Sequence, residues 1–307
     1  MASTAVFESI VSLFLMISVG FYAARKKIIA EDASTVLVNL LIQIILPTMI
    51  LSSFIYSYDD QIKSEIAKTF YYSLTAYLLM IVISYLLVKP VKGDKKTVLH
   101  FANVFPNTGY VGFPVLQAVY GPEGIVYGSV FNLFFVIFVW TYGIIIYRGA
   151  LNKENLPREL KKTLLNPSVL AVCAGILIMA FDIKLPNALL VSIRNLGSMT
   201  GPLSMLIIGM ILSGAKVGSF TRDWTLYYGA ACKLAVIPLI IYLLAQHTGI
   251  TSVALNSVII MTAMPASAMT SIFAHSFDKE KDYAAVVVTL TTVISVVTIT
   301  LFLKAIL

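Results

Sequence analysis

Long apolar runs separated by short polar stretches follow one another along the whole chain. A helix needs about 20 apolar residues to cross the hydrocarbon core of a bilayer. Ten segments come close to that length, at residues 5–23, 35–55, 67–88, 98–120, 124–147, 165–181, 186–214, 225–245, 250–275 and 283–303. The seventh is long enough to include an interfacial stretch between Asn187 and Arg194. The pattern therefore predicts an all-α polytopic membrane protein with ten transmembrane helices.

The composition supports this interpretation and excludes several other classes of protein. Charged residues make up 12% of the 307 residues, whereas a soluble domain carries about 25%. The mean hydropathy is +0.90. So few charges cannot cover the surface of a soluble globule, which excludes a soluble enzyme, a disordered protein and a nucleic-acid binder. Cys173 and Cys232 both lie in apolar runs, so no disulfide framework is expected.

Lysine and arginine are distributed unevenly among the predicted loops. The loops after spans 1, 3, 5, 7 and 9 hold 16 of the 22 basic residues, while the other loops and the termini hold 5. Cytoplasmic loops carry the excess of basic residues in membrane proteins. We therefore expect a cell-membrane protein with these odd-numbered loops in the cytoplasm and both termini outside. The first span is interpreted as a helix and not a signal peptide, because its basic residues follow it at positions 25–27.

The spans divide into two sets of five, which predicts an inverted repeat. Residues 149–164 form the longest predicted cytoplasmic connection, between a first half at 1–148 and a second half at 165–307. An odd number of spans in each half makes the second half enter the membrane in the opposite sense. Prolines recur in equivalent spans: Pro47 and Pro202 lie 155 residues apart, and Pro106 and Pro265 lie 159 apart. Spans 4 and 9 are thus predicted to be broken helices.

These paired breaks are the candidate binding site. Proline removes a backbone donor and clashes with the preceding turn, and unwound backbone in a membrane persists only beside protein or a polar cavity. The N-terminus of each second half-helix carries partial positive charge, which favours a carboxylate or a similar anion. A single proline often only kinks a membrane helix. The predicted binding residues are Asn103, Pro106, Asn107, Thr108, Gly109, Asn132, Lys233, Met264, Pro265, Ala266 and Ser267.

Lys233 is the only clear charge in the middle of a predicted span. Two interpretations stay open for it. Its side chain either snorkels to the membrane surface, or it acts in the site by adding positive potential or by substituting for a coupling cation. No aspartate or glutamate lies at mid-span, so no proton relay is evident, whereas sodium binding to carbonyls at the breaks remains an alternative.

Other polar residues within the spans carry less specific information. Amides in apolar runs commonly join helices through hydrogen bonds, and this holds for Asn39, Asn103, Gln117, Asn132 and Asn256. Glu8 lies near the start of span 1, where a carboxylate is favoured at a helix N-terminus. The three histidines lack the spacing of metal ligands, and no glycine-rich phosphate loop follows a strand. We therefore expect neither a metal nor a cofactor.

The stretch from Asn103 to Val115, NVFPNTGYVGFPV, resembles the crossover of the auxin efflux carrier family of membrane transporters. The shared features are the Pro-Asn pair and the Gly-x-Pro that follows it. The segment GFYAARKK at 20–27, the Leu46-Pro47 pair and the Met264-Pro265 break resemble bacterial and archaeal members in their order and spacing. The resemblance covers essentially the whole chain.

The resemblance implies ten helices in two inverted repeats, with helices 4 and 9 crossing at their breaks. Helices 1, 2, 6 and 7 would form a scaffold, often dimeric, and helices 3–5 and 8–10 a transport domain that moves against it in an elevator-type cycle. Substrates would be organic anions such as auxin, malate or malonate, with Asn107 on the substrate carboxylate. The short linker and the absence of an acidic residue between Thr69 and Leu79 differ from the plant carriers, which argues against auxin specificity.

The leading hypothesis is a secondary carrier for a small organic anion, embedded in lipid as a homodimer and without a nucleic-acid partner. A sodium-coupled symporter of the related bile-acid type and a non-transporting membrane receptor remain alternatives. An intramembrane enzyme is disfavoured, because no cluster of nucleophile, base and acid is evident in the spans.

Overall fold

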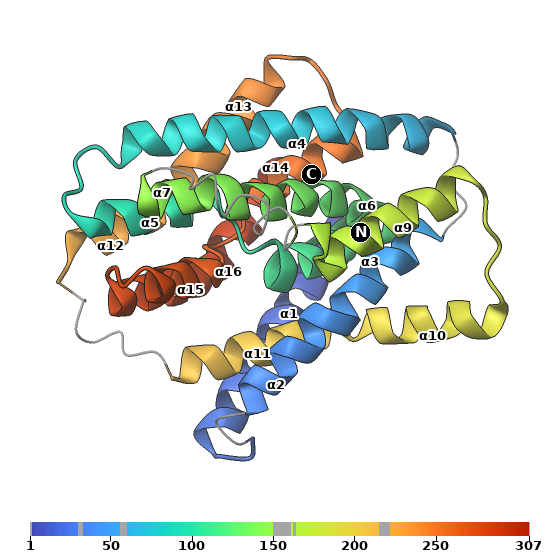
Figure 1. Ribbon diagram of the computed structural model, residues 1–307, viewed down its shortest axis with the longest axis horizontal. Coiled ribbons are helices and arrows are strands. Elements are labelled where there is room, and N and C mark those ends of the chain that lie inside the picture. The colour runs from blue at the N-terminus through green and yellow to red at the C-terminus, as the bar shows by residue number, and fades with distance from the viewer. Residues whose placement is uncertain are drawn as a thin grey trace.

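The computed structural model describes residues 2–29, 33–55, 60–149, 161, 164–214 and 222–306, and most of the predicted linker at 149–164 lies outside these ranges. The described chain is almost entirely helical (Figure 1). In the first half the helices are α1 (Ala2–Arg25), α2 (Ala33–Leu40), α3 (Leu46–Phe54), α4 (Asp60–Leu87), α5 (Asp94–Val104), α6 (Phe113–Phe138) and α7 (Ile144–Arg148). In the second half they are α9 (Pro167–Ala180), α10 (Asn187–Ser198), α11 (Thr200–Ser213), α12 (Trp224–Ala231), α13 (Ile237–Gln246), α14 (Val253–Thr262), α15 (Met269–Ser276) and α16 (Lys281–Ile306).

Within the described ranges, short π-helical turns interrupt four of the predicted spans. They are η1 (Leu41–Ile45), η2 (Thr108–Gly112), η3 (Val139–Gly143) and η5 (Cys232–Val236). Three of them stand directly before a helix with proline in its first turn, at Pro47, Pro114 and Pro238. Proline cannot donate the regular helical hydrogen bond and forces the preceding turn to widen. Pro47 and Pro238 therefore distort their spans without breaking them.

All ten predicted spans coincide with helices of the structure. Within the described ranges, six helical stretches are long and apolar enough to cross a membrane, and Pro167–Ala180 and Val253–Thr262 are among the shorter apolar helices. One of the six, Thr108–Arg148, contains the second part of predicted span 4 and all of span 5. The chain reverses between them at Gly121, whose φ of 61° is readily adopted only by glycine. The part of the chain that the structure describes is all-helical, as predicted, and the ten-span inverted repeat stays a prediction.

The predicted interfacial stretch at 187–194 lies within α10, which runs on into α11 across a single turn at Met199 (Figure 1). The pair Pro47 and Pro202 therefore produces no open break in either half. Instead, the hydroxyl of Thr200 lies 3.5 Å from the carbonyl oxygen of Ile45 and donates to it. This hydrogen bond joins predicted spans 2 and 7 at the places where each is distorted.

The helices form two packing groups that also contact each other, since α6 packs against α1, α3 and α9. In one, α1 lies along α11, and α3 packs against both α9 and α10. In the other, α4 packs against α5, α6 and α14, while α16 packs against α12 and α15. Gly20 and Gly209 let α1 and α11 approach closely, because a Cβ at either position would collide with backbone atoms of the opposite helix. Small residues allow such close packing between helices in a membrane.

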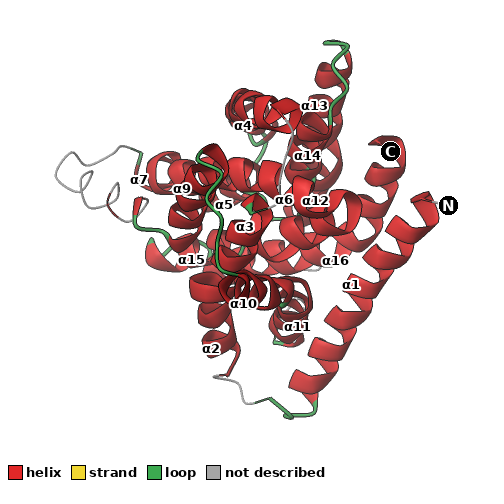
Figure 2. Cartoon of the chain, turned by 90° about the vertical axis from the view of Figure 1, so that its right-hand side faces the viewer, coloured by secondary structure: helices red, strands yellow, loops and turns green. Residues whose placement is uncertain are grey.

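Contacts join the regions that follow predicted spans 3, 5, 7 and 9. Lys95 forms an ion pair with Asp223 at 2.7 Å, and Lys279 forms one with Asp94 at 3.2 Å. The Arg148 guanidinium lies 5.1 Å from the centre of the Phe277 ring. The two chain ends also lie close together, with α1 beside the end of α16 (Figure 2). Both observations agree with an even number of spans, and which side faces the cytoplasm stays a prediction.

Asp223 joins three helices in this region. One carboxylate oxygen accepts from the backbone N–H of Thr225 at 3.0 Å and from its hydroxyl at 2.7 Å, which caps α12. The other accepts from Lys95 of α5, and the Thr225 hydroxyl lies 2.8 Å from that of Tyr283 in α16. Partial burial opposes ionisation, but the hydrogen bonds from Lys95 and Thr225 outweigh it and hold the pKa of Asp223 below its usual value.

Asp223→Ala should lower the free energy of unfolding by about 1–2 kcal/mol, because α12 loses its cap and Lys95 loses its partner. A carboxyl with a depressed folded-state pKa contributes stability above its unfolded pKa of about 3.9 and loses it as pH falls through the folded value. In thermal unfolding in detergent, the Asp223→Ala variant should therefore lose less stability on acidification than the wild-type protein does. Asp282→Ala, which removes an exposed carboxylate of α16, is the control. Equal stability of the two variants near neutral pH would contradict the assignment.

Candidate functional site

Two interrupted helices meet at their breaks. The chain is unwound between α5 and η2, and again between α14 and α15. Across the gap, Pro106 and Ala266 form an isolated antiparallel β-bridge. The N–H of Asn107 donates to the carbonyl of Pro265 at 2.7 Å, and the N–H of Ser267 donates to the carbonyl of Phe105 at 3.0 Å. Each break thereby supplies partners for backbone groups that the other releases.

A polar side chain stands at the start of each second half-helix. The side-chain oxygen of Asn107 accepts from the N–H of Tyr110 at 3.1 Å, and the Ser267 hydroxyl accepts from the N–H of Met269 at 3.2 Å. The Thr108 hydroxyl donates to the side-chain oxygen of Asn132 at 2.7 Å. Because helix N-termini carry partial positive charge, these two convergent ends form an environment suited to an anion. With its oxygen engaged in the cap, the Asn107 side chain presents its NH2 group as a donor.

The structure brings the predicted site residues together at this crossover. Asn107, Thr108 and Ser267 are buried beside the bridge, and Asn132 holds Thr108 in place. The backbone at Gly109 lies against Leu46 of α3, whose side chain would be 3.6 Å from a Cβ at that position. Met264 is fully buried in the apolar core. The contribution of these residues to substrate binding stays a prediction.

Lys233 and Asn103 lie at the opposite ends of the breaks, where the first half-helices finish. Lys233 is fully buried, and its ammonium donates to the carbonyls of Asn103 at 3.2 Å and Thr262 at 3.4 Å. The snorkelling interpretation is therefore wrong, since the side chain ends inside the protein. Both polar atoms of the Asn103 side chain are buried without a hydrogen-bond partner in the described part of the chain. An unsatisfied buried amide is costly and often indicates a functional position.

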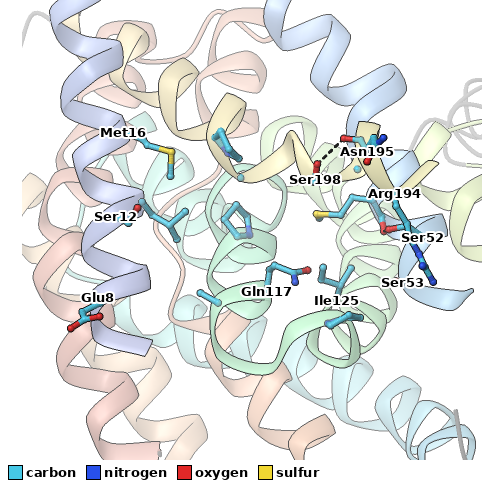
Figure 3. Close-up of a pocket in the computed structure, with 18 residues that line it drawn as sticks. Glu8, Ser12, Met16, Ser52, Ser53, Gln117, Ile125, Arg194, Asn195 and Ser198 are labelled. Carbon is cyan, nitrogen blue, oxygen red and sulfur yellow. Dashed lines mark hydrogen bonds between the residues drawn. The ribbon is translucent and has the colours of Figure 1, made fainter. Parts of the chain in front are cut away.

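A cavity of about 780 Å³ is lined in part by Gln117 of α6, the helix that follows η2 (Figure 3). Its walls come from α1, α3, α6, α10 and α11, and this volume falls in the range of sites for small organic molecules. Glu8 and Ser12 lie on one wall, and Ser52 and Arg194 lie on the opposite wall (Figure 3). Gln117 extends from α6 between them. One cationic and one anionic side chain thus line a largely uncharged cavity.

The sequence pattern of the membrane transport protein family matches residues 5–303, nearly the whole chain. The chain belongs to this family. An uncharacterized transporter of Methanocaldococcus jannaschii is 24% identical over 305 residues, covering 96% of this chain and 97% of that protein. An uncharacterized transporter of Methanothermobacter thermautotrophicus is 20% identical over 300 residues, covering 96% of each. The resemblance to auxin efflux carriers is confirmed, and the protein is a multi-pass membrane transporter.

In this membrane transporter, none of the residues predicted from sequence as binding residues lines the cavity. Arg194 and Gln117 have the polar groups of a binding site but were indistinguishable from ordinary interfacial or helix-joining residues in the sequence. The sequence held one signal for this cavity. Its polar residues lie on four different predicted spans, and in each span they are near the end that faces the same predicted side of the membrane. Pro114, which lines the cavity, follows the last residue of η2 by only two positions, so the cavity and the crossover share a helix.

Proposed function

We propose that this membrane transporter is a secondary carrier that moves a small carboxylate across the cell membrane by alternating access. The observation that carries the proposal is the paired break, where two capped half-helix N-termini converge around Asn107 and Ser267. Each N-terminus is equivalent to roughly half a positive charge, so two of them match one carboxylate. Interrupted helices that point their N-termini at an anionic group are a recurring arrangement in secondary transporters.

The cavity supports an access route to this site. It holds an arginine, which binds carboxylates through its planar pair of N–H donors, and hydroxyl and amide groups that suit a small polar solute. Pro114 and Gln117 place the cavity wall on the helix that begins at the crossover. We propose that the anion enters the cavity past Arg194 and reaches Asn107 when the two groups of helices shift relative to each other.

The two packing groups support an elevator-type movement. We propose that the first group, which contains predicted helices 1, 2, 6 and 7, serves as a scaffold, and that the second, which contains helices 3–5 and 8–10, moves as a transport domain. The two groups meet at several places, including α6 against α3 and α9, and at the crossover Leu46 of the first group lies against Gly109 of the second, which has no side chain. A smooth apolar contact of this kind carries no directional bonds that sliding must break. The homodimer stays a prediction.

Counterflow in proteoliposomes tests the proposal. The purified protein is reconstituted with unlabelled malate, malonate or acetate inside, and uptake of the labelled anion is followed. Saturable counterflow in choline chloride without sodium is the expected result. Binding of an anion without any exchange would identify a receptor, and exchange that requires sodium would identify a symporter.

Replacing Arg194 should weaken the response to external anion. For Arg194→Gln, the substrate concentration for half-maximal counterflow should rise several-fold at low salt, and the difference should shrink as added salt screens the charge. Arg194→Lys keeps the charge and should stay closer to wild type. Lys184→Gln, which neutralises an exposed lysine that does not line the cavity, is the matched control. An Arg194→Gln protein with an unchanged concentration dependence at low salt would remove Arg194 from the route.

A further inference from the structure

The ammonium of Lys233 lies between the carboxyl ends of two half-helices. Asn103, whose carbonyl it binds at 3.2 Å, is in the last turn of α5, and Thr262, bound at 3.4 Å, is the last residue of α14. These helices come from different halves of the chain. In sequence, Asn103 lies 130 residues from Lys233, and Thr262 lies 29 residues from it. One side chain from a third helix therefore donates hydrogen bonds to the C-terminal carbonyls of both.

The charges at this point balance. The C-terminus of a helix is equivalent to roughly half a negative charge, so two such ends together amount to about one, which a single ammonium neutralises. Among the described residues, Lys233 is the only Lys, Arg, Asp or Glu side chain that is buried. The described ion pairs join other residues, so no carboxylate competes for it. The carbonyl ends are therefore the principal negative partners of this buried cation.

The helix that carries Lys233 is itself irregular at this position. It lies in the π-helical turn η5, directly before a proline at the start of α13. The widened turn is a local departure from regular helix that recurs at functional sites. Asn103, whose backbone carbonyl binds the ammonium, also has a side chain that is buried without a hydrogen-bond partner in the described part of the chain.

We propose that Lys233 is a built-in cation of the crossover, which takes the place that a metal ion occupies in cation-coupled carriers. Backbone carbonyls at helix breaks are the ligands through which such carriers hold sodium, and here the ammonium engages both carbonyl ends. The carrier then cycles without a monovalent metal ion. Lys233 acts through the helix ends and does not touch the substrate, so it is a positioning residue. This inference rests on the proposed carrier function.

Thermal unfolding in matched salts tests the inference without any substrate. The wild-type protein in detergent should melt within about 1 °C in equal concentrations of sodium, potassium and choline chloride, because no site is open to a metal ion. Lys233→Ser removes the ammonium and its stem, so it should melt lower in choline and recover several degrees in sodium. Lys304→Ser, which shortens an exposed lysine of α16, should show no response to sodium.

Counterflow supplies a second readout. Lys233→Met, which keeps the bulk of the side chain but lacks the charge, should slow exchange about tenfold or more, and Lys233→Arg should retain a larger share of the wild-type rate. Sodium-specific stabilisation of the wild type would overturn the inference, as would a Lys233→Ser protein that melts equally in sodium and choline. If Lys233→Ser does not fold, the inference is still tested by the melting temperature of the wild type in the three salts and by the exchange rates of Lys233→Met and Lys233→Arg. If no carboxylate is exchanged while the melting results hold, the carrier proposal fails and the built-in cation stands.

Discussion

Asn107→Asp should weaken carboxylate binding by at least about tenfold, which corresponds to about 1.4 kcal/mol. Aspartate is as good a helix cap as asparagine, so the hydrogen bond from the N–H of Tyr110 is expected to persist and the fold with it. The substitution replaces the NH2 donor with a second anionic oxygen. A substrate carboxylate would then meet like charge where the two half-helix N-termini converge, and isothermal calorimetry or a competition assay on purified protein measures the loss.

The structure offers a matched control for this change. Asn166 caps α9 in the same way, with its side-chain oxygen accepting from the N–H of Ser168 at 3.0 Å. Asn166→Asp makes the same chemical change on a helix of the other packing group, and we expect it to leave affinity unchanged. Asn107→Ala should fall between wild type and Asn107→Asp, because it loses a donor without adding repulsion. Wild-type affinity in a folded Asn107→Asp protein would place the site elsewhere.

Gly209→Ala should destabilise the protein by about 1–3 kcal/mol, the usual cost of overpacking. A Cβ at this position would collide with the carbonyl oxygen of Ile17 and the N–H of Phe21, both backbone atoms of α1. Backbone cannot swing aside as a side chain does, so α1 and α11 must separate along their contact. The melting temperature in detergent and the yield of monodisperse protein measure the effect.

Gly201→Ala is the control, because it makes the same substitution in the same helix, where a Cβ would have nothing within 4 Å. Alanine is a better helix former than glycine, so this variant should be neutral or more stable by up to about 1 kcal/mol. A Gly209→Ala protein as stable as Gly201→Ala would show that α1 and α11 do not need to approach so closely.

Much of the architecture could be predicted from the sequence because a bilayer imposes strict local rules. Every span must be apolar for about 20 residues, so ten apolar segments with few charges located the helices and excluded soluble classes. Proline in the interior of a helix either kinks or breaks it. Pro106 and Pro265 mark the two open breaks, whereas Pro47 and Pro202, which looked equivalent in the sequence, produce only distortions that neighbouring turns absorb.

Only the tertiary structure decided which groups meet, because those contacts join residues far apart in the chain. The bridge between Pro106 and Ala266 depends on how the two halves pack. The direction of Lys233 depends on the carbonyl ends that α5 and α14 bring within reach, since no local pattern distinguishes a snorkelling lysine from a buried one. The cavity beside Arg194 is shaped by five helices at once. Local chemistry determined where the helices lie and where they break, and packing over long sequence distances determined what the breaks and the buried charge can bind.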